Sequence, residues 1–543
     1  MAWSGSGVTC RKGSSVIRER VEQHLVRLLG ELPAGHEVEF IKDPKFGDVA
    51  SNVAFFLAKL RHQSPKAIAE ELVPQLTGLP EFTRVAVGGA GFLNFAFSDA
   101  WLADGIRAAA EPDFGRASFG AGQRVNVEYV SANPTGPLNV ANARAGAYGA
   151  ALVSLLRFTG HEAISEYYVN DSGGQIELFA LSVAARVAEQ KGEPWTIPEG
   201  GYHGDYLVPI AREILDKDIP RPDWGGFGLD RIVAGQRATL ERFGVRFDSF
   251  ITDSEIRRTN DFVLNRLAEK DASFKQDGAL WFKAQAFGDT EDRVLIKSNG
   301  EPTYALTDMN YHRQKFERGF DRLITVWGAD HHGDIARLKG GLQAMGYPAD
   351  KLEIVIVQWA TLLRDGQKVS MSKRAGEFIT IDEVLDEIGA DALKFFLLMR
   401  RASQHLEFDL ALAKRTSKEN PVYYAQYSHA RISSILRFAQ EKGVDVAARP
   451  TRMEFTDPAE RMLTKMILRF PDTVAGAARA LEPHRLVYYA LDLANTFHAF
   501  YEQARVVSDD AAATAFRVNL CQRTRQTMRQ ALNLLGVSAP EKM

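Results

Sequence analysis

The sequence contains little cysteine and no long apolar run. Only two cysteines, Cys10 and Cys521, occur among 543 residues, too few for a disulfide framework or a cysteine metal site. No apolar run reaches the roughly 20 residues of a membrane-spanning helix, and the first fifteen residues lack the apolar centre of a secretory signal. We therefore expect a cytoplasmic protein with no membrane contact, no tightly bound metal, and a flexible tail over residues 1–14.

Low-complexity tracts and fixed-period repeats are also missing, which argues against disordered and solenoid architectures. What is present is the composition of an ordinary globular protein, with 45% hydrophobic and 25% charged residues. A chain of 543 residues is too long for one hydrophobic core. The length therefore predicts two to four domains.

Net charge is small, at −3, but it is unevenly distributed. Residues 411–543 carry 19 Lys and Arg against 13 Asp and Glu, an excess of six positive charges, so the remainder is acidic. A positive C-terminal domain on an acidic protein suggests a polyanionic partner at that end. The alternative interpretation is a solvated helical surface, which often carries such an excess.

Hydrophobic periodicity divides the chain into three regions. Residues 15–108 combine helical patterns with a strand pattern, VAVGGAGFLNFAF, which predicts a small α+β domain. Residues 109–404 alternate strand and helix patterns, as in a Rossmann-type parallel sheet, with a helical and irregular insertion at about 180–275. From residue 405 to 543 the strand patterns disappear and long helical periodicities predict an all-α bundle.

The stretch SANPTGPLNVAN lies between a predicted strand, VNVEYV, and a predicted helix. Pro137 suits the first turn of a helix, whose free N–H groups and dipole attract anions. Asn139 and Asn142 are three residues apart and share a helical face. These features predict a phosphate-binding turn, although a strand followed by a helix is common without one.

A second polar stretch, RDGQKVSMSKRAGEFIT, places Lys368, Lys373 and Arg374 in a loop bounded by glycines. Flexible cations beside a nucleotide can neutralise triphosphate charge in a transition state. Taken alone, the stretch could equally be a basic surface loop.

Together, SANPTGPLNVAN and SMSKRAGEF resemble the two signatures of class I aminoacyl-tRNA synthetases, usually written HIGH and KMSKS. Further segments narrow the resemblance to the arginine–tRNA ligase (arginyl-tRNA synthetase) family, in that family's order over nearly the whole chain. These segments are VNVEYVSANPTGPL, EYYVNDSGGQIE, DGALWF, PTYALTDMNYHRQKFERGFDRLITVWGADHHG, MSKRAGEFITIDEVLDEIGADALKFFLLMR and NPVYYAQYSHARI. The resemblance implies ATP-dependent attachment of L-arginine to tRNA(Arg) through an arginyl-adenylate, with release of AMP and pyrophosphate. It also implies ATP bound with Mg²⁺ as substrate, and a monomer.

The resemblance also assigns an arginine pocket. Its residues follow the first strand of the sheet and come from later strands: Glu128, Ser131, Asn133, Tyr304, Asp308 and Asp330. Carboxylates suit the forked donors of a guanidinium. For Asp308, a helix cap is the alternative interpretation.

For ATP, the resemblance implies contacts around both signatures and in the GADHHG segment. The residues are Pro137, Asn139, Ala141, Asn142, His331, Met371 and Lys373. Asn139, Asn142 and Lys373 are the catalytic candidates, and Lys373 would stabilise the departing pyrophosphate. No Cys or carboxylate stands at helical ligand spacing with both His331 and His332, so we expect an adenosine contact rather than a zinc site.

For tRNA, the resemblance implies contacts by Asn94 in the N-terminal domain and by Tyr423, Tyr424 and Gln426 in the helical domain. Exposed aromatic side chains can stack on splayed RNA bases. Adjacent tyrosines point differently around a helix, so we expect only one of the pair to face RNA.

The chain departs from its family at the first signature. The family pattern His-x-Gly-His is replaced by Asn139, Val140, Ala141 and Asn142, and Ser370 stands in place of the first lysine of KMSKS. Two hypotheses follow: an active arginine–tRNA ligase with an altered nucleotide site, or a paralogue that lost adenylation and kept arginine or tRNA binding for regulation. We favour the first, because the other site residues are retained. A third hypothesis, a nucleotide-transferring Rossmann enzyme that uses no tRNA, leaves the helical domain unexplained.

Overall fold

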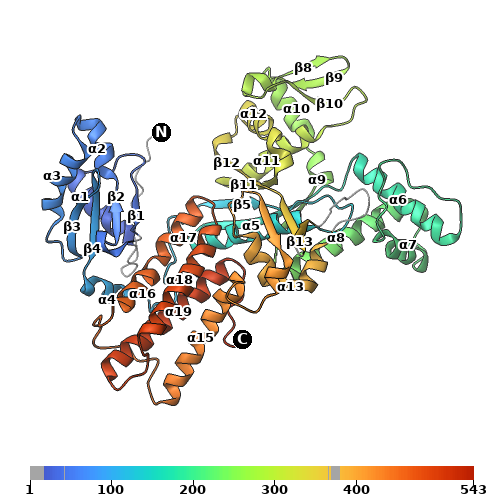
Figure 1. Cartoon of the computed structure of the whole chain (residues 1–543). Coiled ribbons are helices and arrows are strands. Elements are labelled where there is room, and N and C mark those ends of the chain that lie inside the picture. The colour runs from blue at the N-terminus through green and yellow to red at the C-terminus, as the bar shows by residue number, and fades with distance from the viewer. Residues whose placement is uncertain (1–16, 42, 365, 369–378) are drawn as a thin grey trace.

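The computed structural model of the 543-residue chain describes residues 17–41, 43–364, 366–368 and 379–543. Three regions follow one another along the chain. Figure 1 shows the N-terminal region at the left beside the helical C-terminal region, and the central sheet further to the right with two units that project from it. The expected fold class is confirmed: an N-terminal α+β domain, a parallel-sheet catalytic domain and a helical bundle. None of the described helices is long and apolar enough to cross a membrane.

The N-terminal region is an antiparallel sheet of order β1-β2-β4-β3 covered by helices. Its strands are β1 (Val38–Phe40), β2 (Val49–Ser51), β3 (Phe82–Gly88) and β4 (Phe92–Phe97). Its helices are α1 (Ile17–Leu29), α2 (Val53–Arg61), α3 (Pro65–Leu76) and α4 (Asp99–Ala108). Alternate residues of β4 are buried, as expected for a strand with one face on a core.

The central sheet has five parallel strands in the order β12-β11-β5-β6-β7. Its strands are β5 (Arg124–Glu128), β6 (Glu162–Val169), β7 (Ser249–Thr252), β11 (Arg322–Gly328) and β12 (Leu352–Val357). Its main crossover helices are α5 (Val140–Phe158), α11 (Tyr304–Glu317) and α12 (Ile335–Met345). β7 lies within the range 180–275 that we expected to be an insertion, yet it pairs with β6 at the sheet edge.

Two units project from this sheet (Figure 1). One is helical: α6 (Gly174–Lys191), α7 (Leu207–Asp216) and α8 (Trp224–Arg242). The other contains α9 (Asp253–Arg257), α10 (Asn260–Glu269) and a sheet of β8 (Ser273–Gln276), β9 (Ala279–Phe282) and β10 (Arg293–Ile296). The helical unit has its own small core around Phe179, Val183 and Ile210.

A fourth sheet connects the central region to the bundle. It consists of β13 (Ala360–Arg364), β14 (Gln367–Lys368) and β15 (Leu406–Asp409), with α13 (Ile381–Leu397) and α14 (Leu410–Lys414). β15 lies just past residue 405, where we expected only helices; it runs parallel to β13. A four-residue strand depends on a partner distant in sequence, so periodicity alone does not reveal it.

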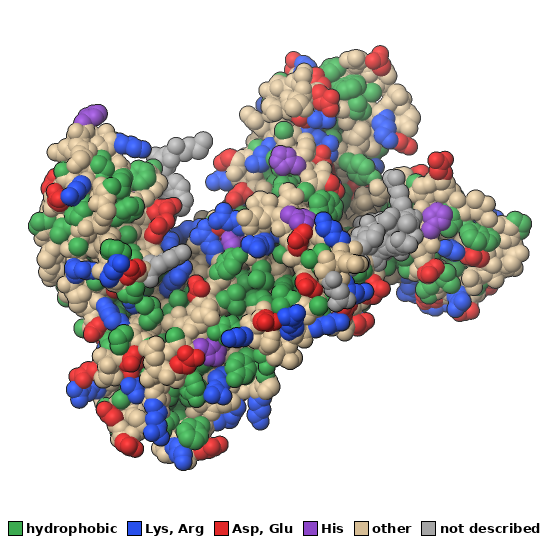
Figure 2. Space-filling model, in the orientation of Figure 1, with side chains coloured by type: hydrophobic (Ala, Val, Ile, Leu, Met, Phe, Trp, Pro, Cys, Tyr) green, Lys and Arg blue, Asp and Glu red, His purple; other side chains and the backbone are tan. Residues whose placement is uncertain are grey.

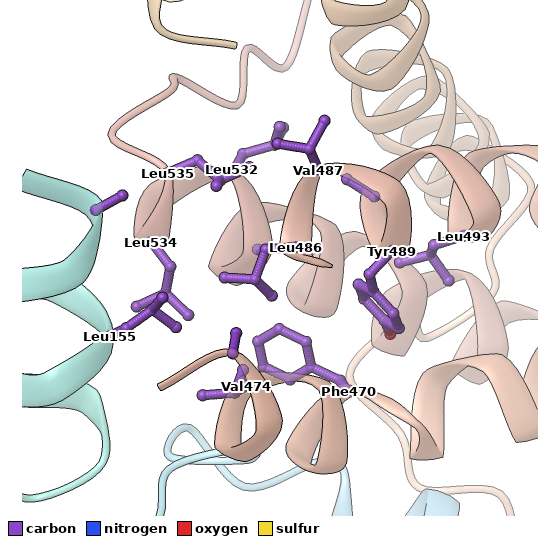
Figure 3. Close-up of a cluster of buried hydrophobic side chains, with 14 of the residues drawn as sticks. Leu155, Phe470, Val474, Leu486, Val487, Tyr489, Leu493, Leu532, Leu534 and Leu535 are labelled. Carbon is purple, nitrogen blue, oxygen red and sulfur yellow. The ribbon is translucent and has the colours of Figure 1, made fainter. Parts of the chain in front are cut away.

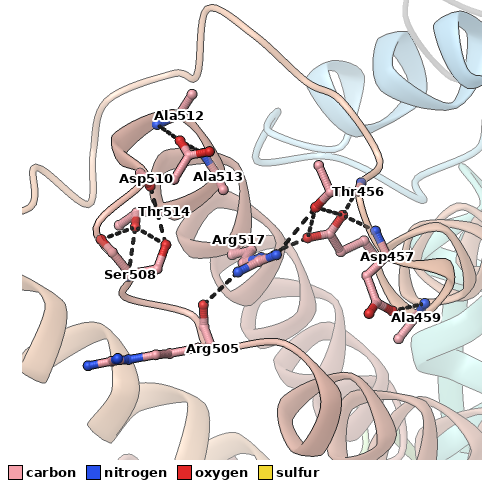
Figure 4. A network of polar contacts seen from close by, with 11 residues as sticks. Thr456, Asp457, Ala459, Arg505, Ser508, Asp510, Ala512, Ala513, Thr514 and Arg517 are labelled. Atoms are coloured by element: carbon pink, nitrogen blue, oxygen red, sulfur yellow. Dashed lines mark hydrogen bonds and ion pairs between the residues drawn. The ribbon is translucent and has the colours of Figure 1, made fainter.

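The bundle consists of α15 (Pro421–Glu441), α16 (Pro458–Leu468), α17 (Phe470–Arg479), α18 (His484–Gln503) and α19 (Ala511–Leu534). Its apolar core extends to the central region, because Leu155 of α5 lies beside Leu534 in the same cluster as Phe470 and Leu486 (Figure 3). A polar network fixes one end of α19, where Arg517 donates to the buried Glu460 at 2.7 Å and to the Arg505 carbonyl at 2.8 Å (Figure 4). The signature helix and the bundle therefore share one core.

Candidate functional site

The candidate site lies where the order of the central strands reverses. The chain runs from β5 outward through β6 and β7, then returns to place β11 on the other side of β5. The carboxyl ends of β5 and β11 are therefore adjacent. The segments that follow these two strands run in opposite directions. Ligands of open parallel sheets bind at such a point.

The backbone after β5 is strained. Val130 and Ser131 both have positive φ, 69° and 38°, a region that β-branched residues such as valine rarely adopt. The turn is held by side-chain contacts, since the Ser131 hydroxyl donates to Glu128 at 3.0 Å and accepts from the Tyr168 N–H at 3.2 Å. Strain of this kind persists where surrounding contacts fix a functional geometry.

Side chains from three parts of the chain hold segment 132–138 in place by hydrogen bonds. The Tyr167 hydroxyl contacts both the N–H and the carbonyl of Ala132, and it donates to Gln236 of α8 at 3.0 Å. The Gln236 amide donates to the carbonyls of residues 133 and 136, and Tyr206 donates to the carbonyl of residue 135 at 2.6 Å. The helical projection thus holds the signature loop in place.

Asn139 and Asn142 form a reciprocal cap at the start of α5. Asn139 Oδ1 accepts from the N–H groups of Ala141 and Asn142 at 3.1 and 3.3 Å, while Asn142 Oδ1 accepts from the Asn139 N–H at 3.0 Å. Both amide oxygens face backbone donors, which fixes the orientation of both amides. Neither NH₂ group has a hydrogen-bond partner among the described residues, so each is available to an incoming acceptor.

The residues that follow the second signature lie beside this turn. Asn139 forms a backbone bridge with Thr380, and the Ile381 N–H donates to the Leu138 carbonyl at 2.9 Å. The start of α13 is therefore held against the signature turn. Met371 and Lys373, the expected ATP contacts in the second signature, lie outside the described residues.

Glu128 is buried and already has partners. Lys315 of α11, fully buried itself, contacts one carboxylate oxygen at 2.7 Å, and the Ser131 hydroxyl takes the other. His312 lies 3.9 Å from the same carboxylate, and burial lowers its pKa well below the usual value. Sequence reasoning missed Lys315, because no local pattern pairs two residues 187 positions apart. Its charge offsets that of Glu128 before any ligand enters.

Asp308 is the less fully paired carboxylate of the site. We expected it, with Tyr304, on a later strand, but both lie on helix α11, and Thr303 rather than Asp308 is the N-cap. Burial raises the pKa of Asp308 to about 7; Arg337, 3.9 Å away, opposes the shift, while the Glu128 carboxylate adds to it. Its side chain is partly exposed, so the carboxylate can meet a cation from outside.

Polar residues after β6 complete this side of the site. Asn133 is exposed; its amide donates to Gln175 at 2.8 Å, and its oxygen accepts from Asn170 at 3.2 Å. The buried Asn170 Oδ1 has no partner among the described residues and remains a free acceptor. The polar run NDS directly after a strand is the signal that could have identified Asn170.

Asp330 and His331 lie on the 3₁₀ turn that follows β11. Both side chains are more than half exposed, 3.6 Å apart, and His331 Nδ1 contacts Asp334 at 3.1 Å. The ring of His331 lies 5.7 Å from that of Trp327. These contacts orient the imidazole at the open end of the site.

Arg144, two residues after Asn142, anchors the signature helix. Its guanidinium is almost fully buried and donates to the carbonyls of Gln358, Arg401 and Gln404 at 2.5, 3.0 and 2.9 Å. Burial lowers the pKa of Arg144 to about 10, with Tyr148 opposing the shift. A buried guanidinium that meets several carbonyls ties α5 to the connection before the bundle.

The expected tRNA-contacting tyrosines belong to an aromatic cluster on α15 and α18. Tyr424 stacks on His498 at 5.2 Å and donates to Asn495 at 2.8 Å, while Tyr423 stacks on Tyr427 at 6.0 Å. Tyr427 also stacks on His498 at 6.2 Å. The structure therefore links both tyrosines through Tyr427 and His498, which sequence reasoning did not single out.

The two other expected tRNA contacts, Gln426 and Asn94, lie outside this aromatic cluster. Gln426 donates to Asp391 at 2.8 Å and to the Ser538 carbonyl at 3.0 Å, so its amide already has partners. Asn94 lies in the middle of β4, between Ala50 and Ala86 of the neighbouring strands.

Family models match three parts of the chain. An arginyl tRNA synthetase N-terminal domain matches residues 15–97, a class I (R) tRNA synthetase catalytic domain matches residues 230–433, and a DALR anticodon-binding domain matches residues 425–543.

Whole-chain similarity agrees with these models. An arginine–tRNA ligase from Moorella thermoacetica is 45% identical over 95% of this chain and 96% of its own. One from Desulforudis audaxviator is 44% identical over 93% of each chain. The structure of Thermus thermophilus arginyl-tRNA synthetase has the same fold, with a TM-score of 0.78 over 97% of this chain and all of its own, at 24% identity. The chain belongs to the arginine–tRNA ligase family of class I aminoacyl-tRNA synthetases.

Proposed function

We propose that this protein attaches L-arginine to tRNA(Arg) with consumption of ATP. Family membership over nearly the full length carries the proposal, and the cluster of polar groups at the β5–β11 reversal supports it. The domains we propose are residues 15–108, 109–404 and 405–543, after a tail of 1–14. We further propose that it acts as a cytoplasmic monomer.

Arginine would enter with its guanidinium toward Asp308, the partly exposed carboxylate of the site. Glu128 would contribute to this pocket as a hydrogen-bond acceptor, because Lys315 offsets its charge. Ser131, Asn133, Tyr304 and Asp330 would hold the remainder of the amino acid. The free Asn170 oxygen is a suitable acceptor for the α-ammonium group.

ATP, bound with Mg²⁺, would place its phosphates against the first turn of α5. The NH₂ groups of Asn139 and Asn142 would donate to them there, at the positive end of the helix dipole. Pro137, Ala141, His331 and Met371 would contact the nucleotide. The arginine carboxylate attacks the α-phosphate, and Lys373 neutralises charge on the departing pyrophosphate.

The terminal adenosine of tRNA then accepts the arginyl group, with release of AMP. Asn94, Tyr423, Tyr424 and Gln426 would contribute to tRNA binding. Because Gln426 is held by Asp391 and Ser538, its contribution would be to position α15.

The regulatory alternative also has a specific observation in its favour, the replacement of both histidines and the glycine of the first signature. Against it, two amide NH₂ groups at that turn have no hydrogen-bond partner among the described residues and could serve as donors to a phosphate.

The decisive experiment is arginylation of tRNA(Arg) by the full chain at high enzyme concentration, with ATP and labelled arginine. Lys373→Ala gives the background. Charging well above this background supports the proposal. Tight tRNA binding with no charging above background would instead support the regulatory alternative. tRNA should be present in every assay, because members of this family normally need it for efficient activation.

Tyr427 gives a test of the tRNA-binding surface. Tyr427→Ala removes a ring that joins Tyr423 and His498, and we expect tRNA to bind about 5- to 100-fold more weakly, as when one base stack is lost. Fluorescence anisotropy with labelled tRNA measures the change. Tyr427→Phe keeps the ring and should bind like the parent; an equal loss in both variants would contradict stacking.

A further inference from the structure

A cavity of about 630 Å³ lies where the N-terminal domain, the end of α13 and the bundle meet. We call it the junction cavity. Its lining residues are Arg18, Phe40, Arg400, Arg401, Gln404, Arg469, Asp472, Thr473, His484, Arg485, Tyr488, Tyr489 and Asp492. Figure 2 shows Lys and Arg side chains gathered beside the hollow that separates the N-terminal domain from the rest.

The lining is strongly basic, with five arginines against two aspartates. Arg401 and Arg485 share Glu482, at 3.7 and 2.5 Å. Arg400 and Arg469 have no ion pair with any residue that the structure describes. Asp472 is buried and accepts from the Arg18 N–H at 3.3 Å, so it secures α1. The cavity therefore retains a positive charge that its own acids do not balance.

Polar atoms in the wall also lack partners. His484 is only 6% exposed, and its Nδ1 has no hydrogen-bond partner among the described residues; the same holds for the buried Arg18 Nε. A buried ring nitrogen without a partner is costly, which favours a ligand or water that contacts it. Cation–π contacts hold the basic wall in place. The guanidinium carbons of Arg18 and Arg469 lie 5.4 and 4.9 Å from the centroid of the Phe40 ring.

The position of the cavity indicates what it binds. Tyr488 and Asp492 of α18 line the cavity, Asn495 continues the same helical face, and His498 lies one turn further on, in the aromatic cluster. Ten residues of helix separate Tyr488 from His498, a distance of about 15 Å. An RNA strand that stacks on the aromatic cluster would therefore reach the cavity within a few nucleotides.

We propose that the junction cavity seats backbone phosphates of the bound tRNA, on the path from the aromatic cluster toward the catalytic domain. This inference rests on the proposed function. Guanidiniums match phosphate oxygens in charge and geometry, and the unpartnered His484 ring nitrogen adds a further polar atom to the lining.

The same wall is connected to the signature helix. Arg401 and Gln404 line the cavity with their side chains, and their carbonyls accept from the buried Arg144 of α5. Filling the cavity would thus brace the segment that holds the nucleotide-binding turn. The proposal is tested first through the affinity for tRNA.

The test compares the double variant Arg400→Gln/Arg469→Gln with the parent in tRNA binding at several salt concentrations. We expect Kd for tRNA to rise about tenfold or more, and the slope of log Kd against log salt to fall by about one for each arginine. With saturating tRNA, the charging rate should stay near that of the parent, since neither residue contacts the candidate catalytic site. Arg107→Gln/Arg246→Gln removes the same charge from exposed positions outside the cavity and should leave Kd within about twofold.

Arg400→Gln alone guards against a folding artefact, because Arg400 is exposed and has no hydrogen bond or ion pair with any described residue. Arg400→Lys should recover most of the affinity. Parent-like Kd and salt slope in the double variant would overturn the inference. A second result would also overturn it. If tripolyphosphate raises the melting temperature of the parent but not of Arg400→Gln, while both bind tRNA equally well, the cavity is a site for small anions. If the parent fails to charge tRNA at all, it is the proposed function that fails.

Discussion

Replacing Asp308 with asparagine should lower kcat/KM for arginine about 10²- to 10³-fold, with little change in KM for ATP. Asparagine keeps the shape but loses the charge that pairs with the guanidinium, and an unpaired charge in a partly buried site costs about 2–5 kcal/mol. Arginylation at varied arginine and saturating ATP and tRNA measures the effect. Asp350→Asn, at an exposed position on the turn before β12, is the matched control and should behave like the parent.

The pH dependence gives this prediction a second readout. Because burial raises the pKa of Asp308 to about 7, the free enzyme carries a proton there below that pH, and arginine must displace it. KM for arginine should therefore fall as the pH rises from 6 to 8 and then level off. For the same reason arginine should raise the melting temperature more at pH 8 than at pH 6. In Asp308→Asn both dependences should disappear; if they persist, another group controls arginine binding.

A substitution of Glu128 would test arginine binding less clearly than a substitution of Asp308. Its removal would leave Lys315 buried without a counter-charge, and losing one partner of a buried pair destabilises the fold itself. A fall in activity of Glu128→Gln would then mix folding with binding. Asp308 has no such buried partner, since Arg337 lies 3.9 Å away and both side chains are partly exposed.

The positions of these two carboxylates show how far the sequence can be interpreted. Alternating residues in VNVEYV predicted β5, and the polar residues after it predicted a site at its carboxyl end; the sheet confirms that fold class. The sequence did not reveal that Lys315 neutralises Glu128, because that contact depends on how α11 packs under β5. The resemblance led us to expect Tyr304 and Asp308 on later strands, but both lie on a helix of fourteen residues.

Short elements were missed for a related reason. β7 and β15 have four residues each, and both are defined by pairing with strands far away in sequence. The cap formed by Asn139 and Asn142, by contrast, was accessible, because Asn-x-x-Asn at a helix start has the spacing of a capping box. We interpreted both amides as phosphate donors and did not predict that their oxygens would hold the helix.

Asn139 is expected to have two roles: its oxygen caps helix α5, and its NH₂ group donates to a phosphate. Substitutions can separate these two roles. Asn139→Asp keeps an oxygen that accepts from the helix N–H groups, but it places a carboxylate where the NH₂ group points. We expect the melting temperature to be unchanged or slightly higher, because aspartate is a good N-cap beside the helix dipole. The charging rate should fall by about 10³-fold or more, since a carboxylate facing the triphosphate costs several kcal/mol. Thermal unfolding and single-turnover adenylate formation in the presence of tRNA measure the two effects.

Two further substitutions at the same position serve as controls. Asn139→Ser keeps the cap and removes the amide without adding charge, so stability should hold and the rate should fall about 10- to 100-fold. Asn139→Ala loses both functions, with about 1 kcal/mol of stability lost as well. Parent-like rates in Asn139→Ser would show that this amide does not contact the phosphates.

Restoring the family residue tests whether the turn is adapted to asparagine or merely weakened by it. An imidazole at position 139 can reach farther toward the phosphates, but one ring nitrogen cannot accept from both N–H groups as Asn139 Oδ1 does. We therefore expect Asn139→His alone to lose stability and to charge tRNA no faster than the parent. With Asn142→His and Ala141→Gly added, a rate far above the parent's would contradict this expectation, because it would mean that the amides had replaced a better site. A rate at or below the parent's would mean that the cap, the two free amides and the Ala141 methyl form a working nucleotide turn of their own.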